Sequence, residues 1–235
     1  METTNSQKLT ITVTQPTPLS TIIAVVPTEP DQVGDVVART RRRTEALSHA
    51  AGFVGTAIHH SIDGERVLEY SQWLSASSWR EATQRLSERE VDDPGRSDVR
   101  MYEVVLVFSA SGSNLLEIAE PSGVIAMINV LSTDPSRRDQ LMDVWRRGAE
   151  RFWENMPGAV AAALHRSEDG MRLVNYAQWT SGETWQRARQ VAGDNRAGMH
   201  GFGTSDPRLY HLDTIIRAAT QPRTTGWGAD PWLSW

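Results

Sequence analysis

The 235-residue chain contains no cysteine and only one lysine, Lys8, so arginine supplies nearly all of its positive charge. The absence of cysteine excludes disulfides, thiolate nucleophiles, iron–sulfur clusters and cysteine zinc sites. Lys8 lies in a polar N-terminal stretch with no apolar neighbours to desolvate it. This surrounding argues against a Schiff-base lysine.

Long apolar runs and clusters of one charge are also scarce. The runs Val104–Phe108 and Val124–Ile128 have the length of strands and fall far short of a membrane span. The N-terminus shows no apolar segment typical of a secretory signal. The net charge is −5, without a basic stripe of the kind that nucleic acids or anionic membranes attract. We therefore expect a cytoplasmic protein with neither nucleic acid nor membrane as a partner.

Residues recur at a spacing of 106 along the chain, which indicates an internal duplication. Three of the recurring pairs are tyrosine or tryptophan, and chance does not account for so many coincidences at one offset. The equivalent pairs are Gly52 and Gly158, His59 and His165, Ser61 and Ser167, Asp63-Gly64 and Asp169-Gly170, Arg66 and Arg172, Tyr70 and Tyr176, Gln72 and Gln178, Trp73 and Trp179, and Trp79 and Trp185.

Each copy predicts the same order of elements. A β-branched run predicts a first strand, and apolar residues at helical spacing then predict a helix. Asp-Gly between two strand-like runs predicts a hairpin, because both turn residues can adopt positive φ. A second helix and a last strand follow. The ranges are Thr21–Val26, Asp31–Ala50, Phe53–Ser61, Arg66–Trp73, a helix from near Ser75 and Met101–Phe108 in the first copy, and Val124–Val130, Pro135–Asn155, Ala159–Ser167, Arg172–Trp179, a helix from near Ser181 and Leu209–Ile216 in the second.

The order βαββαβ predicts an α+β protein of two ferredoxin-like modules, with antiparallel sheets packed face to face as a fused pseudo-dimer. We expect an N-terminal arm at 1–20, in which Leu9–Val13 could add an edge strand, and a first, structural module at 21–109. A linker at 110–122 leads to the second module at 123–218. The Trp-rich tail at 219–235 is expected to dock on the body; the alternative is a lid over a ligand.

The strand Arg172–Trp179 carries the main candidate site. Side chains alternate along a strand, so Asn175, Ala177 and Trp179 share one face, and Trp185 in the next helix can fold back over it. An amide and two indoles beside a small residue suit a flat, electron-rich aromatic ligand. The alternative is that Asn175 caps backbone groups and both tryptophans belong to the core.

The first copy keeps Trp73 and Trp79 but has Glu69 at the position of Asn175. A carboxylate there would repel an anionic ligand, so the second copy is the expected working site. The alternative is that Glu69 acts as a base in a second pocket.

Patterns for metals and nucleotides are missing. His59 and His60 are adjacent on a strand and point to opposite faces, and no HxH or HExxH spacing occurs. The run Gly201-Phe-Gly203 lacks the third glycine of a dinucleotide loop. We expect no metal, nucleotide or bound flavin.

The run Asn175-Tyr-Ala-Gln-Trp179, after a His-x-Ser-x-Asp-Gly hairpin, resembles the anthrone oxygenases of the antibiotic biosynthesis monooxygenase family. The resemblance covers roughly residues 20–110 and 122–218. It implies that Asn175 and Trp179 are catalytic, and that Arg196 or His200 is an electrostatic or proton partner. The substrate-binding residues are then expected to be Trp185, Asn129, Ala177 and His165.

The resemblance also limits the chemistry. The family's heme-degrading branch uses an asparagine on the first strand, which Asn129 matches, and a histidine on the second helix. The segment Glu183–Ala192 contains no histidine, so heme degradation is not expected.

By the same resemblance, the chain is expected to be a monooxygenase that acts with O₂ on a polycyclic phenol or anthrone-type polyketide. Proton removal gives a carbanion that passes one electron to O₂; the radicals recombine as a hydroperoxide, and loss of water gives a quinone. Asn175 would hydrogen-bond the developing oxyanion, and Trp179 would stack on the substrate and donate its N–H.

Other functions stay open at this point. One is a ring-cleaving oxygenase of an angucycline-type polyketide that needs reduced flavin (FMNH₂ or FADH₂) from a separate flavin reductase. Another is a non-catalytic module that binds small molecules, because this fold hosts many functions. A monomer and a homodimer are both compatible with the sequence.

Overall fold

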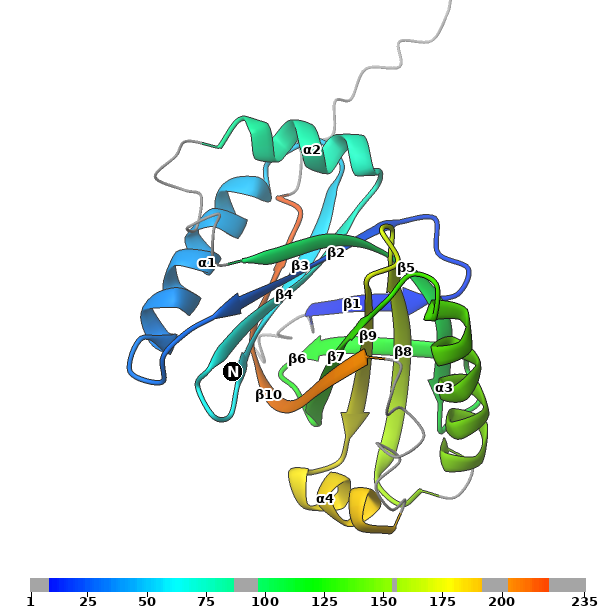
Figure 1. Cartoon of the computed structure of the whole chain (residues 1–235). Helices are drawn as coiled ribbons and strands as arrows, with labels where there is room; N and C mark the ends of the chain where they lie inside the picture. The colour runs from blue at the N-terminus through cyan, green and yellow to red at the C-terminus, as the bar shows by residue number, and fades with distance from the viewer. Residues whose placement is uncertain (1–8, 87–96, 154–155, 192–202, 220–235) are drawn as a thin grey trace, which may run out of the picture.

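The computed structural model describes residues 9–86, 97–153, 156–191 and 203–219, and its elements follow the predicted plan (Figure 1). Each module has the order βαββαβ, from β2 to β5 and from β7 to β10, and one extra strand precedes each module. The elements are β1 (Leu9–Thr14), β2 (Ser20–Pro27), α1 (Val33–Leu47), β3 (Phe53–Ser61), β4 (Arg66–Trp73), α2 (Ala76–Gln84), β5 (Asp98–Ser109), β6 (Leu115–Glu120), β7 (Ile125–Thr133), α3 (Arg138–Trp153), β8 (Ala159–Ser167), β9 (Arg172–Trp179), α4 (Gly182–Val191) and β10 (Gly203–Arg217).

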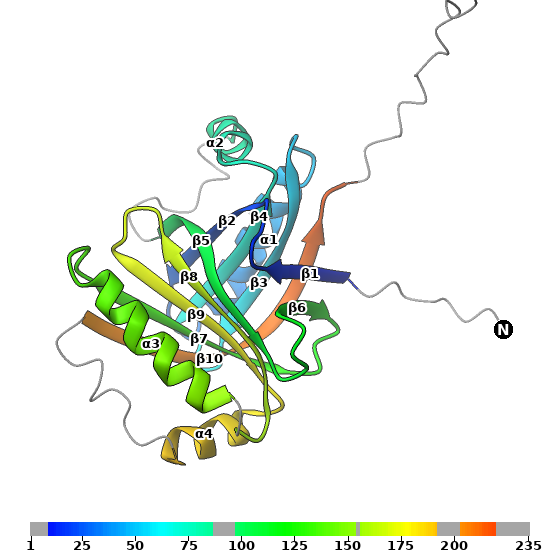
Figure 2. The ribbon, with the colours of Figure 1, turned by 90° about the vertical axis from the view of Figure 1, so that its right-hand side faces the viewer.

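The duplicated α+β architecture is confirmed, and the two sheets are joined at their edges. The strand order β10-β3-β4-β2-β5-β8-β9-β7 closes on itself as a barrel, and every neighbouring pair is antiparallel. The expected face-to-face packing of the two sheets is not confirmed in that form, because the sheets join at both edges into one continuous barrel wall with its helices outside (Figure 2).

Two long strands make this closure possible. The first part of β5, Asp98–Tyr102, pairs with β2 of its own module, and the part from Tyr102 to Ser109 pairs with β8 of the second module. Likewise, β10 pairs with β7 from Gly203 to Tyr210 and with β3 from Tyr210 to Arg217. Because each last strand serves both modules, the modules share one hydrogen-bonded wall.

A two-stranded ribbon of β1 and β6 packs into the interior of the barrel. Ile11 and Ile118 are register partners, and both are fully buried together with Val13 and Leu116. Part of the expected arm and part of the expected linker thus contribute to the core. Gln72 Nε2 donates to the carbonyl oxygen of Thr12 at 2.8 Å, and Gln178 makes the equivalent bond to Glu117 at 2.7 Å.

Aromatic residues tie the modules together at the centre of the barrel. His59 Nε2 lies 3.0 Å from the hydroxyl of Tyr176, and His165 Nε2 lies 3.0 Å from the hydroxyl of Tyr70. Each bond therefore joins a histidine of one module to a tyrosine of the other. Burial lowers the pKa of His59 to about 3 and that of His165 to about 4, so both imidazoles are neutral near pH 7.

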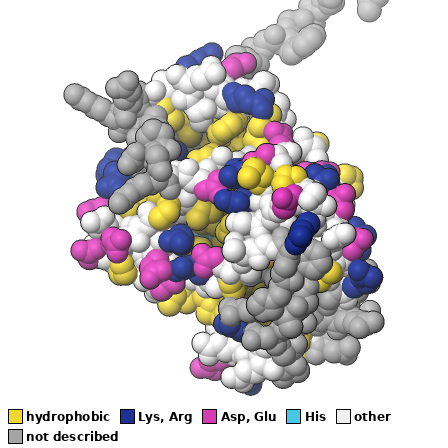
Figure 3. All heavy atoms as spheres, in the orientation of Figure 1, with side chains coloured by type: hydrophobic (Ala, Val, Ile, Leu, Met, Phe, Trp, Pro, Cys, Tyr) yellow, Lys and Arg dark blue, Asp and Glu magenta, His cyan; other side chains and the backbone are white. Residues whose placement is uncertain are grey.

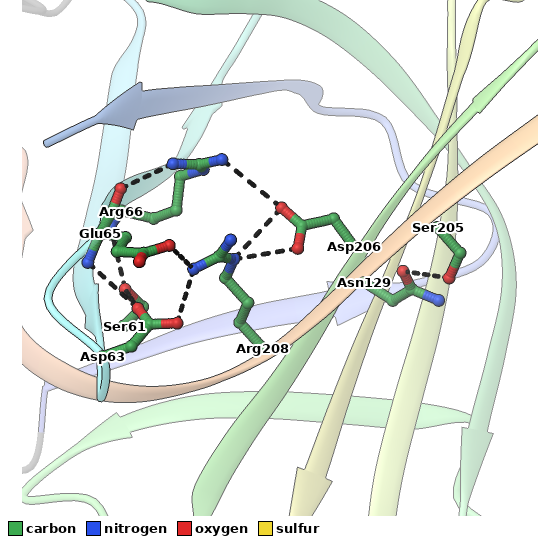
Figure 4. Close-up of polar contacts among 8 residues, drawn as sticks. All are labelled: Ser61, Asp63, Glu65, Arg66, Asn129, Ser205, Asp206 and Arg208. Atoms are coloured by element: carbon green, nitrogen blue, oxygen red, sulfur yellow. Dashed lines mark hydrogen bonds and ion pairs between the residues drawn. The ribbon is translucent and has the colours of Figure 1, made fainter.

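Charged side chains make ion pairs at the two seams of the barrel, where β10 pairs with β3 and where β5 pairs with β8. Arg208 on β10 contacts Asp63 at 2.5 Å and Glu65 at 2.6 Å on the hairpin of the first module (Figure 4). At the other seam Arg100 on β5 contacts Asp169 of the second module. On the face shown in Figure 3, positive and negative side chains are interspersed. None of the helices in the described parts of the chain is long and apolar enough to span a membrane.

Candidate functional site

The candidate site lies on the helix-covered outer face of β9. Leu173, Ala177 and Trp179 belong to apolar clusters beneath the helices, whereas Val174 and Tyr176 belong to the barrel interior. This alternation places Asn175 on the outer face, as predicted from the period of a strand. Asn175 separates the cluster of Ala177 and Trp179 from the cluster of Leu173.

Asn175 presents a buried acceptor to this region. Its side chain is 9% exposed, and its Oδ1 has no hydrogen-bond partner among the residues that the structure describes. A buried amide oxygen without a partner costs roughly 1–3 kcal/mol, so such groups need a reason to persist. A ligand that donates a hydrogen bond to this atom would supply one.

Asn129 lies directly opposite Asn175 on β7. The two residues are register partners, so their side chains occupy the same face of the sheet. Asn129 Oδ1 accepts a hydrogen bond from the Ser205 hydroxyl of β10 at 3.0 Å, which Figure 4 shows beside the seam. The structure therefore brings together two of the predicted site residues, Asn129 and Asn175, and adds Ser205, which the sequence analysis missed.

In the first module an ion pair occupies the equivalent place. Glu69 is 4% exposed, and its carboxylate accepts hydrogen bonds from Thr44 Oγ1 at 2.8 Å and from the guanidinium of Arg43. Both partners lie on α1. The hypothesis of Glu69 as a free base in a second pocket has no support from this geometry, because its two oxygens already have partners.

The second module also has smaller side chains in this corner of the sheet. Thr56 Oγ1 donates to Ser71 Oγ at 2.8 Å, and Ser71 Oγ accepts the indole N–H of Trp73 at 2.8 Å. Ala162 and Ala177 stand 106 residues after Thr56 and Ser71. Ala159 likewise replaces Phe53, whose ring packs edge-on against Trp73 with a centroid separation of 5.1 Å. The first module fills this corner with polar and aromatic groups, and the second lines it with methyl groups.

The two predicted tryptophans lie on the same side of the sheet. Trp179 is 1% exposed and packs with Ile125, Met127 and Ala177. Trp185 on α4 is half-buried and packs against the same cluster, with the guanidinium of Arg189 5.6 Å from its ring centroid. The expected fold-back of Trp185 over the face of Trp179 is present.

His165 does not join this group. It is buried in the barrel interior, where its Nδ1 lies 3.1 Å from the carbonyl oxygen of Val174 and its Nε2 contacts Tyr70. The sheet separates it from Asn175, and its geometry is that of a structural residue. The sequence held a signal for this, because the Asp169-Gly170 hairpin pairs His165 with Val174 and not with Asn175.

The remaining candidates lie outside this part of the structure. Arg196 and His200 fall outside the described residues. Among the described residues, no group of three or more histidine, aspartate or glutamate side chains could hold a metal ion. Two surface hollows lie elsewhere, one beside Tyr102 and Pro16, the other beside Gln178 and Pro121.

Comparison with known proteins identifies relatives of the same kind. The model of the family described as antibiotic biosynthesis monooxygenase matches residues 124–192, which include Asn129, Asn175, Trp179 and Trp185. A curated relative, the tetracenomycin-F1 monooxygenase of Streptomyces glaucescens, is 32% identical over 106 residues, which are 45% of this chain and 81% of the relative.

Solved structures share the fold at low sequence identity. The structure of an anthrone oxidase-like protein superposes with a TM-score of 0.73 at 16% identity, covering 88% of this chain and 97% of that one. A Fusobacterium nucleatum protein proposed to be a monooxygenase has a TM-score of 0.58 at 8% identity, covering 85% of this chain and 94% of that one. These likenesses show the two-module fold.

Proposed function

The chain belongs to the antibiotic biosynthesis monooxygenase family, and from this premise we propose that its second module oxygenates a polycyclic phenol or anthrone of polyketide type with O₂. The observation that carries the proposal is the buried Oδ1 of Asn175, which has no partner among the described residues. The equivalent Glu69 is neutralised by α1, so the proposal assigns one working site to the pair of modules.

The proposed reaction draws its electrons from the substrate. A proton leaves the ring carbon, the resulting carbanion passes one electron to O₂, and the two radicals combine as a hydroperoxide. Loss of water from the hydroperoxide leaves a carbonyl group, so a CH₂ group and O₂ become C=O and H₂O. This sequence needs no metal or bound flavin, and we propose that the protein uses neither.

The residues have separate proposed roles. The amide nitrogen of Asn175 donates to the substrate oxygen on which negative charge develops, because a preorganised dipole is worth more in a buried site than in water. Its buried Oδ1 is left to accept a hydrogen bond from a neighbouring substrate hydroxyl. Trp179 and Trp185 hold the flat ring system, and Ala177 leaves room for it. Arg196 and His200, assigned by resemblance alone, are the proposed electrostatic or proton partners.

An oxygen electrode tests the proposal directly. The purified protein should consume O₂ with an anthrone in the absence of flavin and of any reductase. Asn175→Ala should lower kcat/KM by about 10²–10³-fold, as expected for loss of one preorganised hydrogen bond. Glu69→Gln is the matched control, because glutamine can keep the contacts to Thr44 and Arg43; it should leave kcat/KM unchanged.

Three results would contradict the proposal. Equal losses from both variants would exclude a single site in the second module. Uptake that depends on added reduced flavin would favour the flavin-dependent alternative. Binding of the anthrone without any oxygen uptake would favour a non-catalytic binding module.

A further inference from the structure

Two amides lie side by side on the outer face of the second module. Asn129 and Asn175 are register partners on β7 and β9. Directly opposed residues of antiparallel strands have Cβ atoms about 5 Å apart, which is within reach of two substituents on one aromatic system. The arrangement can therefore contact two neighbouring oxygens of the same ligand.

Ser205 fixes the orientation of the Asn129 amide. Its hydroxyl donates to Asn129 Oδ1 at 3.0 Å, so the NH₂ group of Asn129 is the end that remains as a donor. Asn175 supplies the opposite polarity through its buried Oδ1, which has no partner within the described part of the chain. A hydrogen-bond donor and an acceptor thus stand next to each other.

The first module has the serine without the amide. Ser97 occupies the place of Ser205 one residue before the Asp-x-Arg run of its strand, and Ala24 occupies the place of Asn129 opposite Glu69. The buried hydroxyl of Ser97 has no hydrogen-bond partner among the described residues. The serine–asparagine bond therefore accompanies Asn175 and is absent where the ion pair of Glu69 fills the site.

The strand that carries Ser205 is anchored on the first module. Asp206 and Arg208 follow Ser205 on β10, and Arg208 contacts both Asp206 and the hairpin residues Asp63 and Glu65 (Figure 4). The register of β10, and with it the position of the Ser205 hydroxyl, thus depends on contacts made across the seam.

We propose that Ser205 is a positioning residue that fixes Asn129 as a donor beside the acceptor of Asn175, and that the pair selects phenols whose hydroxyl flanks a carbonyl group. This inference rests on the proposed function. The flanking hydroxyl donates to Asn175 Oδ1, and the carbonyl oxygen accepts from the amide nitrogen of Asn129. When the substrate loses its proton, negative charge grows on that carbonyl oxygen, where the fixed donor of Asn129 acts together with the amide nitrogen of Asn175.

The test uses two substrates and three variants of the full chain. One substrate is unsubstituted anthrone, and the other is anthrone with hydroxyls on the carbons that flank the carbonyl. Wild-type protein should prefer the hydroxylated compound. Ser205→Ala should lower kcat/KM by about tenfold for both anthrones, the usual worth of one buried hydrogen bond, because both carry the carbonyl group that the donor of Asn129 contacts. Ser205→Thr keeps a hydroxyl and should restore both values, and Ser97→Ala should leave them unchanged.

Anaerobic binding separates this inference from the proposed function. Tryptophan fluorescence titration without O₂ gives the Kd of each anthrone independently of turnover. If the wild-type protein binds with the expected preference and Ser205→Ala weakens both anthrones, but no O₂ is consumed, the proposed function fails and the role of Ser205 stands. If Ser205→Ala leaves the binding and turnover of both anthrones unchanged, or if Ser205→Thr does not restore them, the positioning role is overturned. Equal wild-type affinities for the two anthrones would overturn the selection.

Discussion

The outer face of the first module carries a closed polar cluster, and the same place in the second module carries an amide with an open acceptor. Glu69 meets Arg43 and Thr44 of α1, whereas Gly148 and Ala149 stand at those two positions of α3, counted from the equivalent first hydrogen bonds of the helices at Val36 and Leu141. The guanidinium that neutralises Glu69 thus has no counterpart at 148. A neutral amide in its place needs no counter-ion and can bind a ligand oxygen.

The inner faces of the two modules carry the same residue types in equivalent contacts. Each contributes one histidine and one tyrosine to the centre of the barrel, and each histidine contacts the tyrosine of the other module. Substitutions there would disturb both modules at once. The comparison teaches that the duplicated chain keeps its shared core symmetric and confines its differences to the outer faces, where one copy can serve packing and the other a ligand.

Breaking the ion pair of the first module should have the largest effect. Arg43→Ala leaves the Glu69 carboxylate buried without its counter-ion, so the free energy of unfolding should fall by about 3–5 kcal/mol in a denaturant titration. Adding Glu69→Asn, which copies the second module, should recover most of the loss because the amide is neutral.

A surface arginine of the same helix provides the control. Arg41 pairs with Glu45 one turn away, and both side chains are more than half exposed. Arg41→Ala should therefore cost only about 0.5 kcal/mol. If the two arginine variants lose the same stability, the closed cluster of the first module is not the feature that separates the modules.

The two buried histidines that the modules share should make the stability of the protein depend on pH. Burial lowers the pKa of His59 to about 3 and of His165 to about 4, against 6.5 in the unfolded chain. Below 6.5 the unfolded chain binds protons that the folded chain does not, so stability should fall as pH decreases from about 6.5 toward about 4. The slope should be about 1 kcal/mol per pH unit for each histidine.

Substituting one histidine at a time separates the contributions of His59 and His165 to the pH dependence of the free energy of unfolding. Each of His59→Gln and His165→Gln should remove about half of the pH dependence in urea titrations at about pH 6 and about pH 5. Asp63 and Asp169 contribute little at these pH values, because their pKa values are lowered from 3.8 and the stability they provide is lost mainly below that pH. A slope that only one variant reduces would show that the interior is less symmetric than the contacts indicate.

The sequence predicted the local features of this structure well. The offset of 106 residues, the Asp-Gly turns and the alternation along Arg172–Trp179 are local or periodic signals. They correctly gave the order of elements and the shared face of Asn175, Ala177 and Trp179. Both second helices begin directly after the predicted serines, Ser75 and Ser181. Ser75 Oγ accepts the N–H of Ser78 and Ser181 Oγ accepts the N–H of Thr184, so each serine caps its helix.

Contacts between distant segments could not be predicted in the same way. The closure of the barrel depends on the far ends of β5 and β10, which pair with strands of the other module. The pairing of β1 with β6 joins residues more than 100 positions apart, as in Leu9 with Glu120. Two side-chain contacts follow from such packing, that of Arg43 with Glu69 and that of Ser205 with Asn129. No short sequence motif predicts either contact.

The smallest expected effect tests whether space exists beside Asn175. The double variant Ala162→Thr with Ala177→Ser copies the Thr56–Ser71 pair of the first module into the second. If the methyl-lined corner holds a ligand, the added atoms enter unfilled space and the free energy of unfolding should change by less than about 1 kcal/mol, because the new hydroxyls can bond to each other. The affinity for an anthrone, measured by anaerobic fluorescence titration, should fall several-fold.

If the corner is instead solid packing, overfilling it should lower the free energy of unfolding by about 1–3 kcal/mol and leave the affinity for the anthrone unchanged. That second outcome would remove the physical basis for placing catalysis in this module, whereas the shared barrel and the duplication would be unaffected.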